Sequence, residues 1–210
     1  MFAIKLIVCA LAGYALGNFS TGILVGKLFA HKDIREVGSG SSGSTNVIRS
    51  FGLLPGLLTV AGDFLKGLAA ALIGQALCGT AGLLVCGIAS VIGHDYPALF
   101  GFKGGKGIIT SLGVILVIEP WLAPALFLLE LLIAVVTKYM SVGAIIIMLL
   151  FPAAIVFLFS QNPDFLLLLA GSLVISALAI FRHKANIVRL IQGKESRFEA
   201  EKILKSKRPR

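Results

Sequence analysis

The sequence predicts an all-α membrane protein with seven transmembrane helices, and three observations support this fold class. Hydrophobic residues make up 57% of the 210 residues, charged residues make up only 14%, and the mean hydropathy is +0.96. Soluble domains carry about a quarter charged residues, so lipid is the expected solvent for most of this chain. The apolar residues gather in runs close to the roughly 20 residues that a spanning helix needs. The basic residues, finally, fall almost entirely in alternate loops.

Charged residues and clusters of Gly and Pro divide the chain into seven apolar segments. We expect spans at 2–29, 53–76, 80–99, 107–118, 121–137, 142–159 and 165–181. The first is expected to be a retained helix, because its apolar run is too long for a signal peptide and lacks a small-residue cleavage site. The fourth is short and follows a glycine-rich stretch, which is typical of broken helices that line a polar cavity.

The distribution of Lys and Arg predicts the orientation. With the N-terminus outside and the C-terminus cytoplasmic, the inner loops and inner helix ends hold 18 of the 19 basic residues, which leaves only Lys5 outside. An excess of Lys and Arg in cytoplasmic loops is the usual topology signal. We therefore expect a multi-pass protein of the bacterial inner membrane with its polar loops on the cytoplasmic face.

The domain organisation predicted is one integral-membrane domain over 1–198 and a basic cytoplasmic tail over 199–210. The tail contributes to the net charge of +9 and is expected to lie near anionic lipid, without a catalytic role. Nucleic acid is not an expected partner, because no aromatic-interleaved groove or recognition motif accompanies the basic residues. The three cysteines lie in apolar runs without metal-ligand spacing, so we expect neither a disulfide nor a metal site.

The informative polar residues form three clusters in inner loops. The first cluster is glycine-rich and ends in an arginine. Glycines let the backbone approach an anion, and hydroxyls with an arginine complete a phosphate cradle, although a flexible Gly/Ser linker is the alternative interpretation. The residues of this cluster predicted to bind substrate are Gly38, Ser39, Gly40, Gly43, Thr45, Asn46 and Arg49.

The second cluster places lysines in a glycine turn before a helix. Such a turn presents a point charge, free N–H groups and the positive end of a helix dipole to one anion. Its spacing is not that of a Walker A loop. His94 precedes the turn, and a polar helix cap is its alternative interpretation. The members of this cluster are His94, Lys103, Gly104, Gly105, Lys106 and Gly107.

The third cluster follows the last apolar segment. If the last helix continues past the membrane, His183, Asn186 and Arg189 share one face because they are spaced by three residues. The alternative is a charged helix end that faces water and headgroups. A further pair, Asp63 and Lys66, lies inside the second apolar segment, where ionisable residues are costly unless they are paired or face a polar cavity. At this spacing the pair could also simply neutralise itself.

Together the clusters resemble the bacterial acyl-phosphate:glycerol-3-phosphate acyltransferases, the PlsY family. The resemblance runs in order through nearly the whole chain, to about Phe198. It is carried by four motifs, namely Gly38-Ser-Gly-x-x-Gly-x-Thr-Asn-x-x-Arg49, Asp63-x-x-Lys-Gly67, Gly93-His94 with Phe102-Lys-Gly-Gly-Lys-Gly107, and Arg182-His-x-x-Asn-x-x-Arg-Leu-x-x-Gly-x-Glu195.

The resemblance implies a seven-helix membrane enzyme that acylates glycerol 3-phosphate and forms lysophosphatidic acid and phosphate. It implies an acyl-phosphate donor, supplied by a peripheral acyl-phosphate synthase, and no cofactor. It also implies a structural role for Glu195. The residues that it places around glycerol 3-phosphate and the transferring group, which we take as the catalytic set, are Ser39, Arg49, Lys106, His183 and Asn186, with His94 nearby.

Two positions depart from the family pattern. Ser41 stands where the family usually has Asn, which removes an amide from the phosphate loop. The segment 18–22, Asn-Phe-Ser-Thr-Gly, stands where a Ser-x-Pro-type segment is common. We therefore expect altered affinity or geometry in the phosphate loop.

Direct acyl transfer is the expected mechanism, because no Ser-His-Asp order and no His-x-x-x-x-Asp box is present. The leaving phosphate or His183 would take the hydroxyl proton. The main alternative function is a small anion or lipid transporter, for which glycine-broken helices and an intramembrane Asp/Lys pair are common. The charged residues, however, gather at one face rather than at the midplane, and no internal repeat is visible. A noncatalytic scaffold leaves the clustered polar residues without a purpose.

Overall fold

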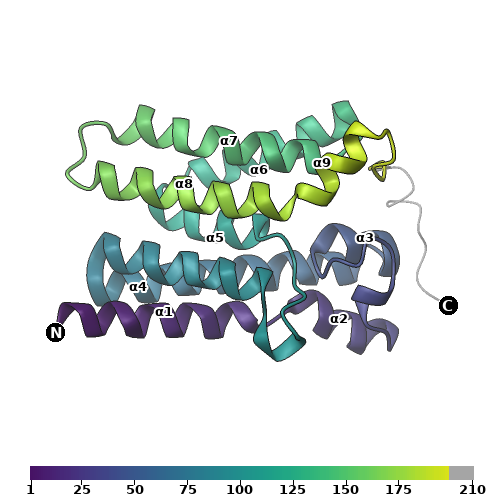
Figure 1. The fold of residues 1–210 in the computed structure, drawn as a ribbon, viewed down its shortest axis with the longest axis horizontal. Coiled ribbons are helices and arrows are strands. Elements are labelled where there is room, and N and C mark those ends of the chain that lie inside the picture. Colours follow the sequence, from purple (N-terminus) through teal and green to yellow (C-terminus); the bar gives the residue numbers. More distant parts are fainter. Residues whose placement is uncertain (199–210) are drawn as a thin grey trace.

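A computed structural model describes residues 1–198, and these residues form a helical bundle without strands (Figure 1). The predicted tail, 199–210, lies outside the described residues. The α-helices are α1 (Phe2–Asn18), α2 (Thr21–Ala30), α3 (Ser44–Phe51), α4 (Leu53–Asp95), α5 (Ile108–Ile118), α6 (Leu122–Thr137), α7 (Met140–Phe159), α8 (Phe165–Arg182) and α9 (Lys184–Ile191). Short 3₁₀ turns cover Ile34–Glu36 and Ala98–Phe100.

Helix α4 is a hairpin of two arms rather than one rod. Cys78 and Gly79 have non-helical backbone angles, and Gly79 has a φ of +59°, which glycine adopts without strain. Gly74 before the turn and Gly82 after it bring the backbones of the two arms close together. The turn therefore lies at the boundary predicted between the second and third apolar segments.

The first apolar segment is broken, which the sequence did not predict. We expected one helix over 2–29, but α1 ends at Asn18 and α2 begins at Thr21, with Phe19 and Ser20 extended between them. The break frees the Phe19 carbonyl, which accepts a hydrogen bond from Lys66 Nζ at 2.8 Å. The break coincides with the segment that departs from the family pattern.

Among residues 1–198, four segments are long and apolar enough to cross a membrane by length and composition, and two shorter apolar helices lie among them. The long segments are Phe2–Ala30, Leu53–Phe100, Met140–Phe159 and Phe165–Arg182, and the shorter ones are Ile108–Ile118 and Leu122–Thr137. Because Leu53–Phe100 contains the α4 hairpin, these elements coincide closely with the seven apolar segments predicted. The seven-helix count and the orientation of the termini stay predictions.

The apolar core lies where α4, α5, α7 and α8 meet. Phe151, Ile147 and Met148 of α7 are fully buried there, and Ile115 of α5 and Ile175 of α8 pack into the same cluster. Large apolar side chains such as Phe157 and Leu166 remain exposed on the outside of the bundle, as expected for helices that face lipid. The polar loops gather at one end of the bundle, beside α2, α3 and α9, and the N-terminus and the α4 turn lie at the other end (Figure 1).

Candidate functional site

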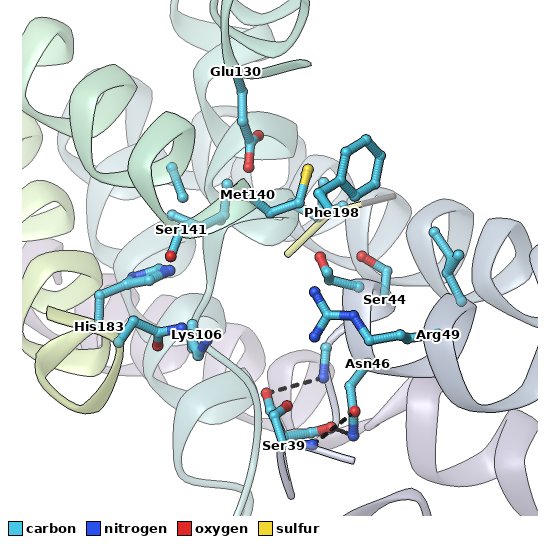
Figure 2. Close-up of a pocket in the computed structure, with 18 of the residues that line it drawn as sticks. Ser39, Ser44, Asn46, Arg49, Lys106, Glu130, Met140, Ser141, His183 and Phe198 are labelled. Atoms are coloured by element: carbon cyan, nitrogen blue, oxygen red, sulfur yellow. Dashed lines mark hydrogen bonds between the residues drawn. The ribbon is translucent and has the colours of Figure 1, made fainter. Parts of the chain in front are cut away.

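A cavity of about 420 Å³ lies at the end of the bundle where the polar loops gather. Figure 2 shows Arg49 and Asn46 entering it from α3, Ser39 from the loop before α3, and Lys106 and His183 from the opposite side. The three clusters predicted to meet therefore share one cavity. The sequence-predicted residues that line it are Ser39, Gly43, Thr45, Asn46, Arg49, Asp63, His94, Lys106, Gly107, His183, Asn186 and Arg189.

The other predicted residues support the cavity from outside its lining. Lys103 is exposed. Lys66 is buried behind Asp63 and pairs with it. The glycines Gly38, Gly40, Gly104 and Gly105 shape the backbone of their loops and do not line the cavity themselves. The predicted residues that do not line the cavity are Gly38, Gly40, Lys66, Lys103, Gly104 and Gly105.

The loop before α3 is held by one buried amide. Asn46 Oδ1 accepts a hydrogen bond from the Ser39 backbone N–H at 3.0 Å, and Asn46 Nδ2 donates to the carbonyls of Ile34, Val37 and Ser41 at 2.9–3.2 Å. The turn also requires Gly38 and Gly40, whose φ angles are +60° and +73°. Asn46 thus orders the loop, which presents Ser39 to the cavity in a fixed geometry. This bonding argues against the flexible-linker interpretation.

Helix α3 adds a cation and free donors to the same wall. Its short amphipathic sequence buries Val47 and leaves Arg49 exposed and directed into the cavity (Figure 2). Gly43 caps the helix without a side-chain hydrogen bond, so the first N–H groups are open. This helix was not predicted from the sequence, because its apolar residues are too few to stand out in a hydropathy profile.

Lys106 lies on the opposite wall, in a loop pinned by backbone bonds. The Gly104 and Gly105 N–H groups donate to the carbonyls of Asp95 and His94 at 3.3 and 3.1 Å. Lys106 is half-buried. Burial lowers the pKa of Lys106 to about 8, and the charges of Arg189, Arg182 and Arg49 add to this effect against Glu195. A cation held among cations is a strong attractor for an anion.

His183 lies beside Lys106, and within residues 1–198 only one of its ring nitrogens has a hydrogen-bond partner. Its Nδ1 is 2.7 Å from the Ala179 carbonyl, which can only accept, so Nδ1 carries the proton and Nε2 keeps a lone pair. Burial, followed by the charge of Lys106, lowers the pKa of His183 to about 4. His183 is therefore a neutral imidazole whose Nε2 can accept a proton. Its position also differs from the prediction of one continuous helix, because His183 is the junction between α8 and α9.

Glu195 organises the third cluster. Its Oε1 accepts hydrogen bonds from Asn186 Nδ2 at 2.7 Å and from Ser141 Oγ at 3.2 Å, and its Oε2 pairs with Arg189 Nε at 2.7 Å. Burial alone would raise the pKa of Glu195, but these hydrogen bonds and the charge of Arg189 lower it below its usual range. Asn186 Oδ1, by contrast, is buried and has no partner among the described residues. The arrangement leaves that oxygen available to a substrate hydroxyl.

Asp63, Lys66 and His94 form a buried, internally bonded group behind the cavity. Lys66 Nζ lies 2.8 Å from Asp63 Oδ1 and 2.8 Å from His94 Nδ1, and it donates to the Phe19 carbonyl. The side chains of Asp63 and His94 reach the cavity lining, but their charges are already matched. This geometry favours the alternative interpretation of Asp63 and Lys66 as a neutralising pair, and their binding role stays a prediction.

Sequence reasoning missed much of the cavity lining, including the polar residues Glu130 and Ser141. Glu130 of α6 is 4% exposed, and its Oε2 has no partner among residues 1–198. The rule that singled out Asp63, an ionisable residue inside an apolar run, would also have found Glu130. Ser141 and Phe198 line the cavity as well, and no sequence signal marks them. Within the described part of the chain, no group of three or more His, Cys, Asp or Glu could hold a metal ion.

A second, apolar pocket of about 270 Å³ adjoins the cavity. Val60, Ile109 and Phe127 line both pockets, so the two share a wall. The rest of the second lining lies between α4, α5 and α6 and consists of Phe64, Leu112, Leu116, Ala123 and Pro124. One end of the combined space is cationic and the other is hydrocarbon-like, which matches an amphiphilic ligand.

Comparison with known proteins gives one consistent answer. The sequence model of a family described as glycerol-3-phosphate acyltransferase matches residues 7–193. The glycerol-3-phosphate acyltransferase of Alkaliphilus metalliredigens (strain QYMF) is 44% identical over 187 residues, covering 89% of this chain and 93% of that protein. That of Finegoldia magna (strain ATCC 29328 / DSM 20472 / WAL 2508) is 41% identical over 192 residues, covering 91% and 96%.

Solved structures agree with the sequence relatives. The crystal structure of PlsY (YgiH), an integral membrane glycerol 3-phosphate acyltransferase, in its glycerol 3-phosphate form superposes with a TM-score of 0.84 at 40% identity, covering 95% of this chain and 98% of that chain. The lysophosphatidic acid form of the same protein gives a TM-score of 0.82 at 38% identity, covering 96% and 99%. The architecture is therefore shared over nearly the whole length of both proteins.

Proposed function

Because the chain belongs to the PlsY family of glycerol-3-phosphate acyltransferases, we propose that it transfers a fatty acyl group from acyl phosphate to the 1-hydroxyl of glycerol 3-phosphate. The products are lysophosphatidic acid and inorganic phosphate. The observation that carries the proposal is the cavity itself, where Arg49 from α3, Lys106 from the loop before α5 and Arg189 from α9 converge beside an apolar pocket. Two anionic groups and one hydrocarbon chain are what such a space can hold.

In the proposed complex the cations bind phosphate. Arg49 and Lys106 lie on opposite walls of the cavity (Figure 2), so a phosphate between them contacts both. The open N–H groups at the start of α3 and the backbone of the Ser39 loop add donors on the Arg49 side. Acyl phosphate is an activated mixed anhydride, so alignment and charge stabilisation supply most of what its transfer requires.

The proposed chemistry is a single displacement without an acyl-enzyme. The glycerol 1-hydroxyl oxygen bonds to the acyl carbonyl carbon, the bond from that carbon to the phosphate oxygen breaks, and phosphate leaves with its electron pair. The hydroxyl proton passes to His183 Nε2 or to the leaving phosphate, and the free oxygen of Asn186 holds a substrate hydroxyl. Glu195 acts through Asn186 and Arg189, which it holds in place.

The acyl chain is assigned to the apolar pocket between α4, α5 and α6. Because the pocket shares Phe127 with the cavity, a chain in it lies among apolar side chains while its carboxyl carbon lies toward the cations. Lipid tails are as apolar as this lining, so the pocket accommodates the chain of a membrane-borne donor without exposing it to water. The expected setting is the cytoplasmic face of the bacterial inner membrane, with a peripheral acyl-phosphate synthase supplying the donor.

The test is an assay of phosphate release by detergent-purified protein. The sample receives palmitoyl phosphate and glycerol 3-phosphate, and palmitoyl-CoA serves as the parallel donor. Phosphate release that depends on glycerol 3-phosphate, together with lysophosphatidic acid in the extract and no product from the CoA donor, is the expected result. Product from palmitoyl-CoA alone would overturn the donor assignment, and trapping of a hydroxylamine-sensitive acyl-protein would overturn direct transfer.

A further inference from the structure

The loop that carries Lys106 has little intrinsic order. It consists of Gly101, Phe102, Lys103, Gly104 and Gly105 before Lys106, and glycine-rich backbone loses more conformational entropy on ordering than other backbone. A cation that must meet a phosphate within a fraction of an ångström cannot depend on such a loop alone. The position of Lys106 therefore requires contacts from outside the loop.

Arg182, the last residue of α8, supplies such contacts. Its Nε and Nη2 donate to the Gly105 carbonyl at 3.0 and 2.7 Å, and Nη2 also donates to the Gly104 carbonyl at 3.5 Å. On its other side the guanidinium lies over the ring of Tyr96, 4.6 Å from the ring centroid. The planar group is thus held between an aromatic face and the backbone directly before Lys106.

Arg182 also adjoins the second reacting group, because the next residue is His183. The hydrogen bonds from Arg182 therefore connect the helix end that carries His183 to the loop that carries Lys106, across 77 residues of sequence. Within the described residues, no other side-chain hydrogen bond joins Gly104 or Gly105 to α8. The backbone bonds to His94 and Asp95 tie this loop to α4, and Arg182 ties it to α8, so Arg182 helps to set the separation between the imidazole and the ammonium.

We propose that Arg182 is a positioning residue for acyl transfer, which fixes Lys106 relative to His183 by binding the Gly104 and Gly105 carbonyls while stacked on Tyr96. The inference rests on the proposed use of Lys106 and His183 in one reaction. Lysine cannot replace Arg182, because an ammonium is a point charge without the planar fork that spans two carbonyls and stacks on a ring. The charge and the shape of Arg182 therefore have separable effects.

The charge of Arg182 has its own signature. The charged groups that face Lys106 are Arg49 from α3, Arg182 from α8, Arg189 from α9 and Glu195 after α9, and His183 is neutral above its depressed pKa. Arg182 is one of the cations that lower the pKa of Lys106. Replacing Arg182 by a neutral residue therefore raises the pKa of Lys106, so Lys106 stays protonated to a higher pH.

The experiment compares Arg182→Lys and Arg182→Gln with the matched control Tyr96→Phe, which keeps the ring. Measured are kcat and KM for glycerol 3-phosphate from pH 6.5 to 9.5, and the Tm with and without glycerol 3-phosphate. We expect both Arg182 variants to lower kcat by about 10- to 100-fold, because misplacement by about 1 Å can cost about 100-fold. Tyr96→Phe stays within about twofold, and Tyr96→Ala loses activity in the direction of the Arg182 variants.

The pH profiles separate positioning from general destabilisation. Arg182→Gln moves the alkaline limb of kcat/KM to higher pH, whereas Arg182→Lys, which keeps the charge, leaves it in place. Wild-type kcat in Arg182→Lys, or an unmoved limb in Arg182→Gln, would overturn the proposal. If Arg182→Gln does not fold, Arg182→Lys and Tyr96→Ala still decide the kcat question. Because every readout is a ratio to wild type, failure of the proposed donor chemistry appears separately, as an inactive wild-type protein.

Discussion

Two pairs of a lysine and a histidine, Lys66 with His94 and Lys106 with His183, differ in how many of their polar atoms already have a partner in the protein. In the first, Lys66 Nζ is bound to Asp63 Oδ1, His94 Nδ1 and the Phe19 carbonyl, each at 2.8 Å. In the second, Lys106 and His183 share a cavity wall, and within residues 1–198 no hydrogen bond or ion pair of Lys106 Nζ is found. His183 uses only Nδ1, which donates to the Ala179 carbonyl.

The difference shows which of two similar residue pairs is free to act on a ligand. Buried ionisable groups that satisfy one another gain little from a substrate and lose much when one partner is removed. Lys106, without a hydrogen-bond partner among the described residues, and His183, whose Nδ1 alone is bonded there, have the opposite property, because a bound substrate supplies the missing interactions. We therefore expect changes at Lys66 to affect stability first and changes at Lys106 to affect catalysis first.

The largest effect is expected for Lys66→Met. The substitution leaves the Asp63 carboxylate buried without its ion-pair partner, which costs about 3–5 kcal/mol. The free energy of unfolding, measured by titration with SDS in mixed micelles, should fall by that amount. The matched control is the double variant Asp63→Leu/Lys66→Met, which removes both charges and should recover most of the stability. A stable but inactive double variant would show that the pair belongs to the substrate site after all.

Lys106→Ala should produce the opposite pattern. Removal of one preorganised cation from the phosphate site is expected to lower kcat by about 100- to 1,000-fold. The Tm of the substrate-free protein should not fall, because Lys106 makes no hydrogen bond or ion pair within the described residues and is repelled by Arg49, Arg182 and Arg189. Activity within about threefold of wild type would remove Lys106 from the mechanism.

The pH dependence sharpens the same contrast. Lys106 has a pKa of about 8, so it is charged below pH 8 and loses its charge as the pH rises through that value. The substrate phosphate stays dianionic there, because its second pKa is about 6. We therefore expect KM for glycerol 3-phosphate to rise above pH 8, by up to about tenfold per pH unit. Lys106→Arg serves as the control, since arginine stays charged and the rise should disappear. A rise that persists in this variant would assign the titration to another group.

The sequence was sufficient for most of the helical architecture. The turn of α4 at Cys78 and Gly79 and the ends of α5 to α8 lie within a few residues of the predicted boundaries, because apolar runs end at charges, glycines or prolines. The break at Phe19 and Ser20 was not predicted, since its residues carry no such signal and the break is stabilised by Lys66 from another helix. Helix α3 was missed for the complementary reason, because it is short and amphipathic.

For the candidate site, the sequence predicted the clusters but not their internal bonding. Glycine turns with cations are recognisable locally, and the structure does bring Arg49, Lys106 and His183 to one cavity. Whether a polar side chain is free or already bound depends on pairs that are distant in sequence, such as Lys66 with His94, which are 28 residues apart. Arg182 was part of the fourth motif, but no role was predicted for it, because its partners are the backbone carbonyls of another loop.

The smallest effect is expected at Ser41, where the family usually has Asn. In the structure Ser41 Oγ accepts a hydrogen bond from the Gly43 N–H at 3.3 Å, and the Ser41 carbonyl accepts from Asn46 at 2.9 Å. A serine hydroxyl and an asparagine amide oxygen both make this bond to the N–H two residues on, so the turn is retained with either residue. Ser41→Asn should therefore change KM for glycerol 3-phosphate by no more than about threefold, about 0.6 kcal/mol, which is at the low end of what one hydrogen bond contributes.

Ser41→Ala is the matched variant, because it removes the bond to Gly43 and keeps the backbone carbonyl that Asn46 uses. Loss of one such bond costs about 0.5–1.5 kcal/mol of loop stabilisation, so KM should rise by roughly two- to tenfold. The measurement is KM for glycerol 3-phosphate in both variants under the conditions used for wild type. If Ser41→Asn instead lowers KM by tenfold or more, an amide at position 41 contacts the phosphate directly, and the loop facing Arg49 is not yet at its full affinity in this chain.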